Sequence, residues 1–399
     1  MKILHINFSD TSGGAAIAVG RIHNLLLKNN HESKILVCEK ISNDDSIIYH
    51  KSTLKLIRSL IYDSLSRKIL KLFKKTNKET SNSLSLYPTG LHKKINSLNP
   101  DIVNLHWLGN SMISIKEISK IKSPIVWTLH DMWPMCGLEH YSTNKKYFIN
   151  ENKSPKQRFN LDDYVWGQKK KYFKKINKII CTSNWMYQKA KNSYIFNDKK
   201  IKEIPITLDT KFWKPQNKIA SKKFFKINSN EQVIAFGADN FLKNNRKGFL
   251  YFSKSVEVFL NNSQYKIIIF GESSNLPFEK NYSNIINLGY VKDKYTLRMI
   301  FSATDVMVVP SLIESFGMVA LESLHCETPC VVFENTGTTS IVNHKVNGYI
   351  AKYKSSEDLK LGINWVLNNT KIVKSNIKRT LGKFDNKEII SQYIKFLQE

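Results

Sequence analysis

The sequence is short of acidic residues. Its 399 residues include 33 Asp and Glu but 61 Lys and Arg, which gives a formal net charge of +28. A field of that size attracts polyanions, so nucleic acid, an anionic membrane and a phosphorylated substrate are all candidate partners. The hydrophobic content of 42% and the aromatic content of 11% are those of a globular protein, which excludes a largely disordered chain.

Long apolar runs and a cysteine framework are also missing. No apolar stretch reaches the ~18 residues that a transmembrane helix needs. The opening MKILHINFSD is typical of a first strand rather than a signal peptide, so we expect a cytoplasmic protein. Five irregularly spaced cysteines predict reduced, mostly buried thiols and no zinc site: Cys38, Cys136, Cys181, Cys326 and Cys330.

Short, nearly continuous apolar runs alternate with helix-length segments along the whole chain. Such runs are typical of strands that are covered on both faces, and their alternation with helices predicts parallel sheets built from βαβ units. Their number favours two open α/β sheets rather than one. The runs lie at 2–8, 33–38, 101–107, 124–130, 177–183, 232–238, 265–271, 305–311 and 329–335.

A segment with two prolines, Pro205–Gln216, separates the two groups of strands. We therefore predict a first Rossmann-like domain over 1–208 and a second over 209–385. The tail is amphipathic at helical spacing, so we expect a C-terminal helix over 386–399 that packs back on the first domain.

The residues just after the predicted strands are candidate site residues, because ligands of open parallel sheets bind beyond the carboxyl ends of the strands. Gly13 and Gly14 follow the first strand, and small residues there let backbone N–H groups approach a ligand. His130 follows a later strand, and Arg246 and Lys247 stand before a predicted helix. Each has a structural alternative: a plain turn, a locally hydrogen-bonded histidine, and ordinary surface cations.

Two glutamates bracket the segment that follows the strand at 305–311. If a helix begins near Ser315, Glu314 lies in the loop and Glu322 about two turns into the helix, with a rise of ~12 Å between them. A ligand as long as a nucleotide with a sugar attached could touch both. The N–H groups of Ser315, Phe316 and Gly317 would then meet its phosphates. The alternative is a surface helix with two solvated glutamates.

An Asp-x-Asp pair, which a metal-bound sugar nucleotide usually needs, is absent from the sequence. We therefore expect no metal site. The charge of a leaving diphosphate would instead be neutralised by Arg246, Lys247 and the helix start at Ser315.

Together these motifs resemble a known family. The segment PSLIESFGMVALE, residues 310–322, is similar to the signature of the retaining glycosyltransferases of family 4. SGGAA, TLHD, LDTKFWKP and RKG also resemble their counterparts in that family, and the resemblance extends over nearly the whole chain, least over 144–163. It implies the GT-B fold, in which an acceptor-side domain and a nucleotide-sugar donor domain face each other across a cleft.

The resemblance also implies an activity. It points to a retaining, metal-independent hexosyltransferase that uses a UDP- or GDP-sugar as co-substrate and no cofactor. The acceptor would be a glycan or a lipid-linked saccharide in the synthesis of bacterial surface polysaccharide, such as capsule, exopolysaccharide or O-antigen.

Roles for individual residues follow from the same resemblance. Glu314 and His130 would contact the donor sugar near the reacting centre, and Glu322 would bind the donor ribose. Lys247 would bind phosphate, with Arg246 beside it, and Gly13–Gly14 would approach the diphosphate and the acceptor. One departure is Ala238, which stands where many members carry a phosphate-binding arginine.

A basic stretch over Leu54–Lys75 has apolar residues at helical spacing and lysines and arginines on its other face. It could hold the protein on the inner face of an anionic membrane, or it could be a domain helix with solvated lysines.

Three other functions stay open. They are a non-catalytic partner subunit that binds a sugar nucleotide, a sugar-nucleotide epimerase of the same fold, and a nucleic-acid-binding protein. The last has only the net charge in its favour, since no RNA- or DNA-binding motif accompanies it, and we expect no nucleic acid as partner.

Overall fold

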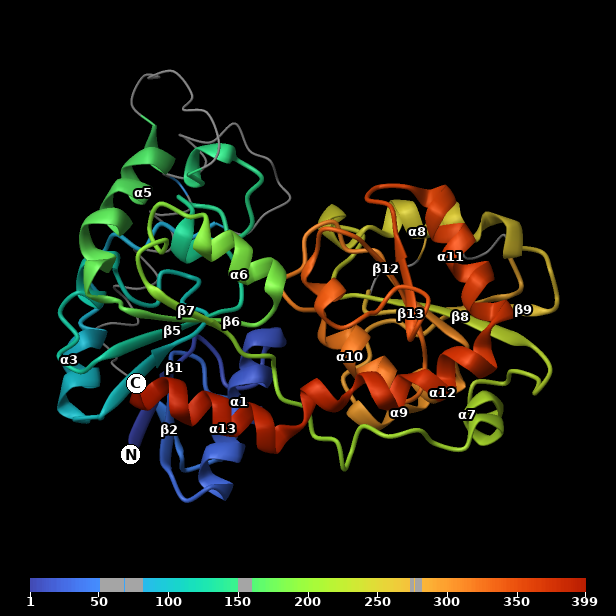
Figure 1. Cartoon of the computed structure of the whole chain (residues 1–399), viewed down its shortest axis with the longest axis horizontal. Coiled ribbons are helices and arrows are strands. Elements are labelled where there is room, and N and C mark those ends of the chain that lie inside the picture. The colour runs from blue at the N-terminus through green and yellow to red at the C-terminus, as the bar shows by residue number, and fades with distance from the viewer. Residues whose placement is uncertain (51–67, 69–81, 150–159, 273–275, 277–281) are drawn as a thin grey trace. The chain divides into compact units, whose positions relative to one another are not determined.

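The computed structural model describes residues 1–50, 68, 82–149, 160–272, 276 and 282–399, and these form two compact units. The first unit comprises Met1–Thr207 together with Asn386–Glu399, and the second comprises Leu208–Asp385 (Figure 1). The predicted boundary at 208/209 lies one residue from this division. The basic stretch Leu54–Lys75 lies, apart from Lys68, outside the described residues.

The described residues of the first unit contain a seven-stranded sheet in the order β3-β2-β1-β4-β5-β6-β7, with every neighbouring pair parallel. Its strands are β1 (Lys2–Ile6), β2 (Glu32–Val37), β3 (Ile47–Tyr49), β4 (Ile102–Leu105), β5 (Ile125–Leu129), β6 (Lys178–Cys181) and β7 (Lys200–Glu203).

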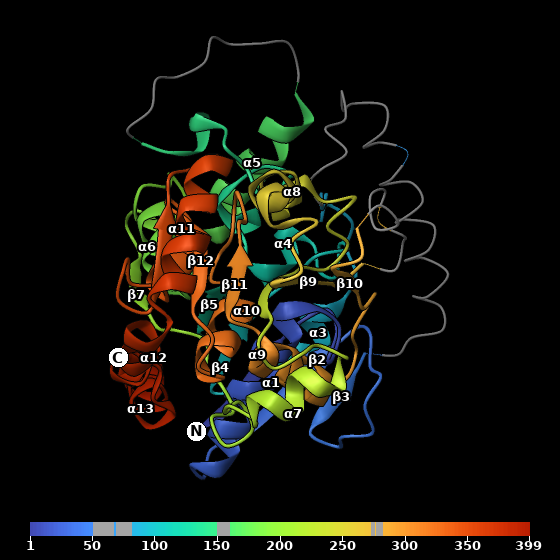
Figure 2. The same cartoon turned by 90° about the vertical axis from the view of Figure 1, so that its right-hand side faces the viewer.

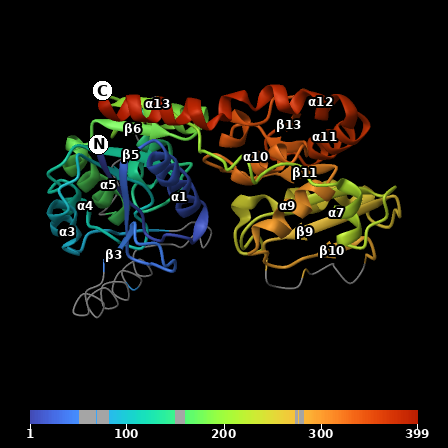
Figure 3. The same ribbon diagram turned by 90° about the horizontal axis from the view of Figure 1, so that it is seen from below.

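Both faces of this sheet are buried. Successive residues of a strand point to opposite faces, so neighbouring residues join different cores. Leu4, Val103 and Trp127 join one core, which packs against α3 (Leu91–Ser97), α4 (Ile115–Ile118), α5 (Leu161–Tyr172) and α6 (Asn184–Lys191). Their neighbours Ile3, Ile102 and Val126 join the opposite core, which packs against α1 (Gly13–Lys28) and α13 (Asn386–Gln398). In Figure 3, α13 lies along the first unit near the N-terminus.

The second unit repeats this plan with six strands in the order β10-β9-β8-β11-β12-β13 in its described residues. The strands are β8 (Gln232–Gly237), β9 (Tyr265–Phe270), β10 (Ile285–Asn287), β11 (Val306–Val309), β12 (Cys330–Phe333) and β13 (Gly348–Ala351). The helices are α7 (Lys218–Phe224), α8 (Phe249–Val256), α9 (Lys294–Ala303), α10 (Met318–His325), α11 (Ser356–Asn368) and α12 (Thr370–Thr380). Figures 1 and 2 show α8 and α11 on one face of the sheet and α7, α9 and α10 on the other.

These two doubly wound sheets confirm the predicted fold class. All nine predicted apolar runs are strands, and β3, β7, β10 and β13 are not among these runs. Each of these four is the last strand at an edge of its sheet. Edge strands pair on one side only and are partly exposed, so they lack the continuous apolar run by which buried strands are recognised.

Among the residues that the structure describes, none of the helices combines the length and the apolarity needed to cross a lipid bilayer. The five cysteines are unpaired, and all but Cys38 are buried, as predicted.

Candidate active site

The order of the strands reverses between β1 and β4 in the first unit and between β8 and β11 in the second. Ligands of doubly wound sheets bind beyond the carboxyl ends of the strands at this point. The helices that follow β1, β8 and β11 all begin without a hydrogen bond from a capping side chain. By contrast, α6, α9 and α11 are capped by Ser183, Asp293 and Ser355. The starts of α1, α8 and α10 therefore have backbone N–H groups that no side chain caps.

In the second unit, the loops after β8 and β11 are locked together. The Leu312 N–H donates to the Arg246 carbonyl at 2.8 Å, and the Arg246 guanidinium donates to the Ile313 carbonyl at 2.8 Å. Gly248 has a φ of 74°, and a Cβ at this position would lie 1.8 Å from the Pro310 carbonyl oxygen. Only glycine permits both this backbone conformation and this close approach.

Glu314 lies at this junction, and two cations lie beside its carboxylate. Its carboxylate is 2.9 Å from the Lys247 ammonium and 3.8 Å from the Arg246 guanidinium. The Ser311 hydroxyl is 3.4 Å away. The side chains of Lys247 and Glu314 are 18% and 14% exposed, so the pair is mostly shielded but still reached by solvent. Two cations thus flank one carboxylate at the carboxyl edge of the sheet, and the charge of Asp239 also acts on Lys247.

The pKa values of this cluster reflect the opposing effects of burial and charge. Burial alone would raise the pKa of Glu314, but the charges of Lys247 and Arg246 hold it below its usual range. Burial lowers the pKa of Lys247 in spite of the opposing charge of Glu314. The opposite charges of Glu314 and Lys247 therefore favour each other's ionised form, against the effect of burial.

The helix after this loop begins later than predicted. α10 starts at Met318, not near Ser315, because Gly317 has a φ of 101° and interrupts the helical path. A backbone hydrogen bond from Ser315 helps to lower the pKa of Glu314. That the N–H groups of Ser315, Phe316 and Gly317 meet phosphates stays a prediction. The Phe316 ring is buried against Phe384, with 6.2 Å between ring centroids.

Glu322 lies in the second turn of α10, closer to the helix start than predicted, and is only 7% exposed. The alternative, in which Glu314 and Glu322 are solvated side chains on a surface helix, is therefore excluded. Ala238 donates its N–H to the Phe270 carbonyl at 3.2 Å, and its carbonyl packs against Gly271. Arg246 and Lys247 are the cations that the structure places at this edge beside Glu314.

In the first unit, Gly13 and Gly14 form the exposed start of α1, directly beyond β1. A Cβ on Gly13 would meet nothing within 4 Å, so the space beside it is open. Ser9 Oγ accepts from the Ser12 N–H at 3.1 Å and orders the turn.

His130 stands just after β5 and is one end of a chain of three imidazoles. Its Nε2 lies 3.0 Å from His106 Nδ1, and His106 Nε2 lies 2.9 Å from His5 Nδ1. His5 is fully buried and His106 is 3% exposed. Burial lowers the pKa of His130 to about 4 and that of His5 to about 3, and it lowers the pKa of His106 as well. All three rings are therefore neutral near pH 7.

Asp131, next to His130, anchors a second polar chain. Its carboxylate lies 2.5 Å from His140 Nδ1, and His140 Nε2 lies 2.8 Å from the Ser83 hydroxyl. This order of groups is that of a hydrolytic triad. Ser83 and His140 are each 3% exposed, and His140 stacks on Trp133, so the serine has no room for an acyl substrate. The hydrogen bonds among Asp131, His140 and Ser83 instead hold the loop after β5 in place.

Sequence reasoning missed His5 and His106. A signal existed for His106, because it follows the predicted strand at 101–107 just as His130 follows the next one. Recognising His5 required the register of β1 against β4, in which His5 pairs with Asn104.

Known proteins of similar sequence and structure agree with this architecture. The family model for Glycosyltransferase Family 4 matches residues 12–212, just over half of the chain, and the model for Glycosyl transferases group 1 matches residues 218–381. The chain belongs to glycosyltransferase family 4.

Individual relatives are distant. An uncharacterized glycosyltransferase of Methanocaldococcus jannaschii is 27% identical over 39% of this chain, and the match covers only 40% of that protein. An uncharacterized 41.2 kDa protein in the cps region of Klebsiella pneumoniae is 23% identical over 89% of this chain and 87% of its own length. The crystal structure of Anabaena HepE in complex with UDP and glucose has a TM-score of 0.65 and 16% identity, with both chains fully covered.

Proposed function

We propose that this protein is a retaining, metal-independent hexosyltransferase that uses a UDP- or GDP-sugar as donor and needs no cofactor. The observation that carries the proposal is the cluster of Glu314, Lys247 and Arg246 at the switch point of the second sheet. Its two cations suit a diphosphate. The UDP complex of Anabaena HepE, a protein of the same fold, supports a nucleotide donor.

The roles of the site residues follow from the family resemblance. In the second unit, Glu314 would contact the donor sugar beside the leaving diphosphate, and Lys247 would neutralise that diphosphate with help from Arg246. Glu322, in the second turn of α10, would hold the ribose hydroxyls. In the first unit, His130 would contact the donor sugar, and Gly13–Gly14 would approach the diphosphate and the acceptor.

The acceptor would be a glycan or a lipid-linked saccharide of a bacterial surface polysaccharide. The relative in the Klebsiella pneumoniae cps region supports this part of the proposal. The protein would act in the cytoplasm at the inner face of the membrane. The membrane contact rests on the sequence of Leu54–Lys75 alone.

The proposal is tested by thermal unfolding against UDP, GDP, ADP and CMP and their sugars, with and without a chelator. A ligand at a hundred times its dissociation constant stabilises the folded state by about 2.7 kcal/mol. We expect stabilisation by one base and its sugar, unchanged by chelator. Stabilisation that disappears with chelator would contradict metal independence. No stabilisation by any nucleotide would favour a protein that does not bind sugar nucleotides.

A further inference from the structure

The chain of three histidines links the candidate site to the interior of the first unit. His5 lies in β1, His106 just after β4 and His130 just after β5, and these strands are neighbours in the sheet. His130 is the partly exposed end of the chain, whereas the other two rings are buried. The question is which nitrogen of each ring carries the proton.

A neutral imidazole has one N–H donor and one acceptor nitrogen. In a chain of neutral rings, each hydrogen bond needs one of each, so the donors must all point the same way. Either every ring donates toward His5, or every ring donates toward His130. The two arrangements place the proton of His130 on different nitrogens.

The buried end of the chain decides between them. His5 Nε2 is buried and has no hydrogen-bond partner among the described residues. If the donors pointed toward His5, this nitrogen would carry a buried N–H with no acceptor. Orphaned buried N–H groups are rarer in proteins than acceptors that lack a donor. The donors therefore point toward His130: His5 Nδ1–H donates to His106 Nε2, and His106 Nδ1–H donates to His130 Nε2.

We propose that His5 and His106 are positioning residues that hold His130 in its neutral Nδ1–H form. In the described part of the chain, His130 Nδ1 makes no hydrogen bond of its own. His130 also borders a cavity of about 30 Å³, which is enough for a water molecule or a hydroxyl group. The inference rests on the proposed function for its consequence: His130 donates a hydrogen bond from Nδ1 to an oxygen of the sugar substrate and does not accept a proton there.

The protonation state can be measured without any substrate. In the full-length protein with ¹⁵N-labelled histidine, long-range ¹H–¹⁵N correlation distinguishes protonated from unprotonated ring nitrogens, and His130→Gln assigns the signal. We expect Nδ1 of His130 to be protonated, although free histidine side chains favour the Nε2–H form. An Nε2–H form in the wild-type protein would overturn the proposal.

Variants test whether the chain is the cause. His106→Phe removes the donor and keeps the ring volume, so we expect His130 to become a mixture of both forms. His23→Gln is the control, because His23 is also buried but bonds to the Ser33 and Ser46 hydroxyls rather than to the chain. An unchanged His130 signal in His106→Phe would refute the positioning role. If this variant does not fold, His106→Asn, which can still donate near the position of Nδ1, should keep the Nδ1–H form, and loss of that form would count against the proposal.

Kinetics separates this inference from the proposed function. For sugar transfer, we expect His106→Phe to lower kcat about tenfold with KM nearly unchanged, and His106→Asn to restore most of kcat. Equal kcat for His106→Phe and wild type would overturn the positioning role. A wild-type protein without transferase activity would contradict the proposed function, while the spectrum of His130 would still decide the direction of the chain.

Discussion

Strand β11 has a carboxylate with two cations at each of its ends. Asp305 precedes the strand and lies beside Lys218 and Lys222, while Glu314 follows the strand and lies beside Lys247 and Arg246. In each cluster one carboxylate lies beside two cations, and both clusters are mostly shielded from solvent. Sequence and charge alone do not say which of them is functional.

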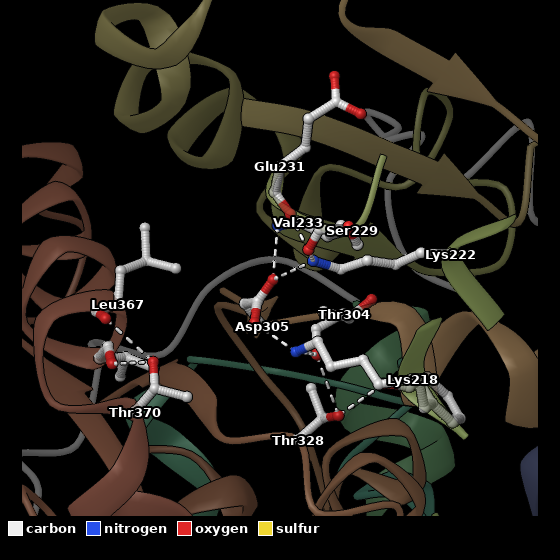
Figure 4. Close-up of polar contacts among 12 residues, drawn as sticks. Lys218, Lys222, Ser229, Glu231, Val233, Thr304, Asp305, Thr328, Leu367 and Thr370 are labelled. Atoms are coloured by element: carbon white, nitrogen blue, oxygen red, sulfur yellow. Dashed lines mark hydrogen bonds and ion pairs between the residues drawn. The ribbon is translucent and has the colours of Figure 1, made fainter. Parts of the chain in front are cut away.

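The partners of the two clusters differ. Asp305 accepts from the Val233 N–H at 2.9 Å, and Lys222 donates to the Ser229 and Glu231 carbonyls (Figure 4). These bonds tie α7 to the starts of β8 and β11. At the other end, the partners of Glu314 lie on loops at the edge where doubly wound sheets bind ligands. Position in the sheet, rather than charge, therefore distinguishes a structural cluster from a candidate binding site.

The largest expected effect is on catalysis. Glu314→Gln should lower kcat for sugar transfer by about 10²–10³-fold, because it removes charge beside the reacting sugar. Glu322→Gln should act mainly on KM for the donor. Steady-state kinetics with the identified donor measures both, and Asp305→Asn should leave kcat of the folded fraction unchanged. If Asp305→Asn lowered kcat as much as Glu314→Gln, the assignment of different roles to the two clusters would be wrong.

The next largest expected effect is on stability, and it concerns Asp305 at the start of β11. Asp305→Asn should lower the free energy of unfolding by about 3 kcal/mol, because Lys222 would remain buried without its carboxylate. Urea denaturation measures this change. Glu314→Gln should cost less, since the Lys247 side chain that loses its carboxylate is 18% exposed, whereas that of Lys222 is only 6% exposed. Equal losses in the two variants would show that both clusters are structural.

A smaller effect concerns the junction of the two loops. Gly248→Ala should lower the free energy of unfolding by about 1–3 kcal/mol, because the new Cβ collides with the Pro310 carbonyl at a strained φ. It should also weaken nucleotide binding by moving Lys247 away from Glu314. Gly382→Ala is the matched control in the same unit, since a Cβ there meets nothing within 4 Å. Calorimetric titration with the nucleotide should show weaker binding for the first variant only.

The smallest effect is on pH dependence. Burial lowers the pKa of Lys247, so this ammonium loses its proton at a lower pH than an ordinary lysine does. Nucleotide affinity should be full below that pKa and should fall about fivefold as pH rises through it, because a charged donor becomes a neutral one. Lys247→Arg keeps its charge at high pH and should remove this decline. A decline that persists in Lys247→Arg would assign it to another group.

Much of the fold was predictable because buried parallel strands leave a strong apolar signal. The interior strands show it, whereas β3, β7, β10 and β13 do not, since an edge strand needs no continuous apolar run. The site residues were predictable as individual positions after strands. The start of α10 was not, because the conformation of Gly317 and the bond from Ser315 to Glu314 depend on neighbouring loops. The histidine chain needed the pairing of β1, β4 and β5, which a single sequence does not contain.

The return of α13 to the first unit has a consequence for how this protein is made. The core formed by Ile3, Ile22 and Ile102 is completed only by Ile389 and Phe396, and the whole second unit is synthesised in between. At about 5–20 residues per second, the ribosome needs roughly 10–40 s for that interval. During this time the first unit has an apolar face uncovered, and such transiently exposed surface favours aggregation. A stop codon placed before α13 would remove a part of the first unit, not of the second.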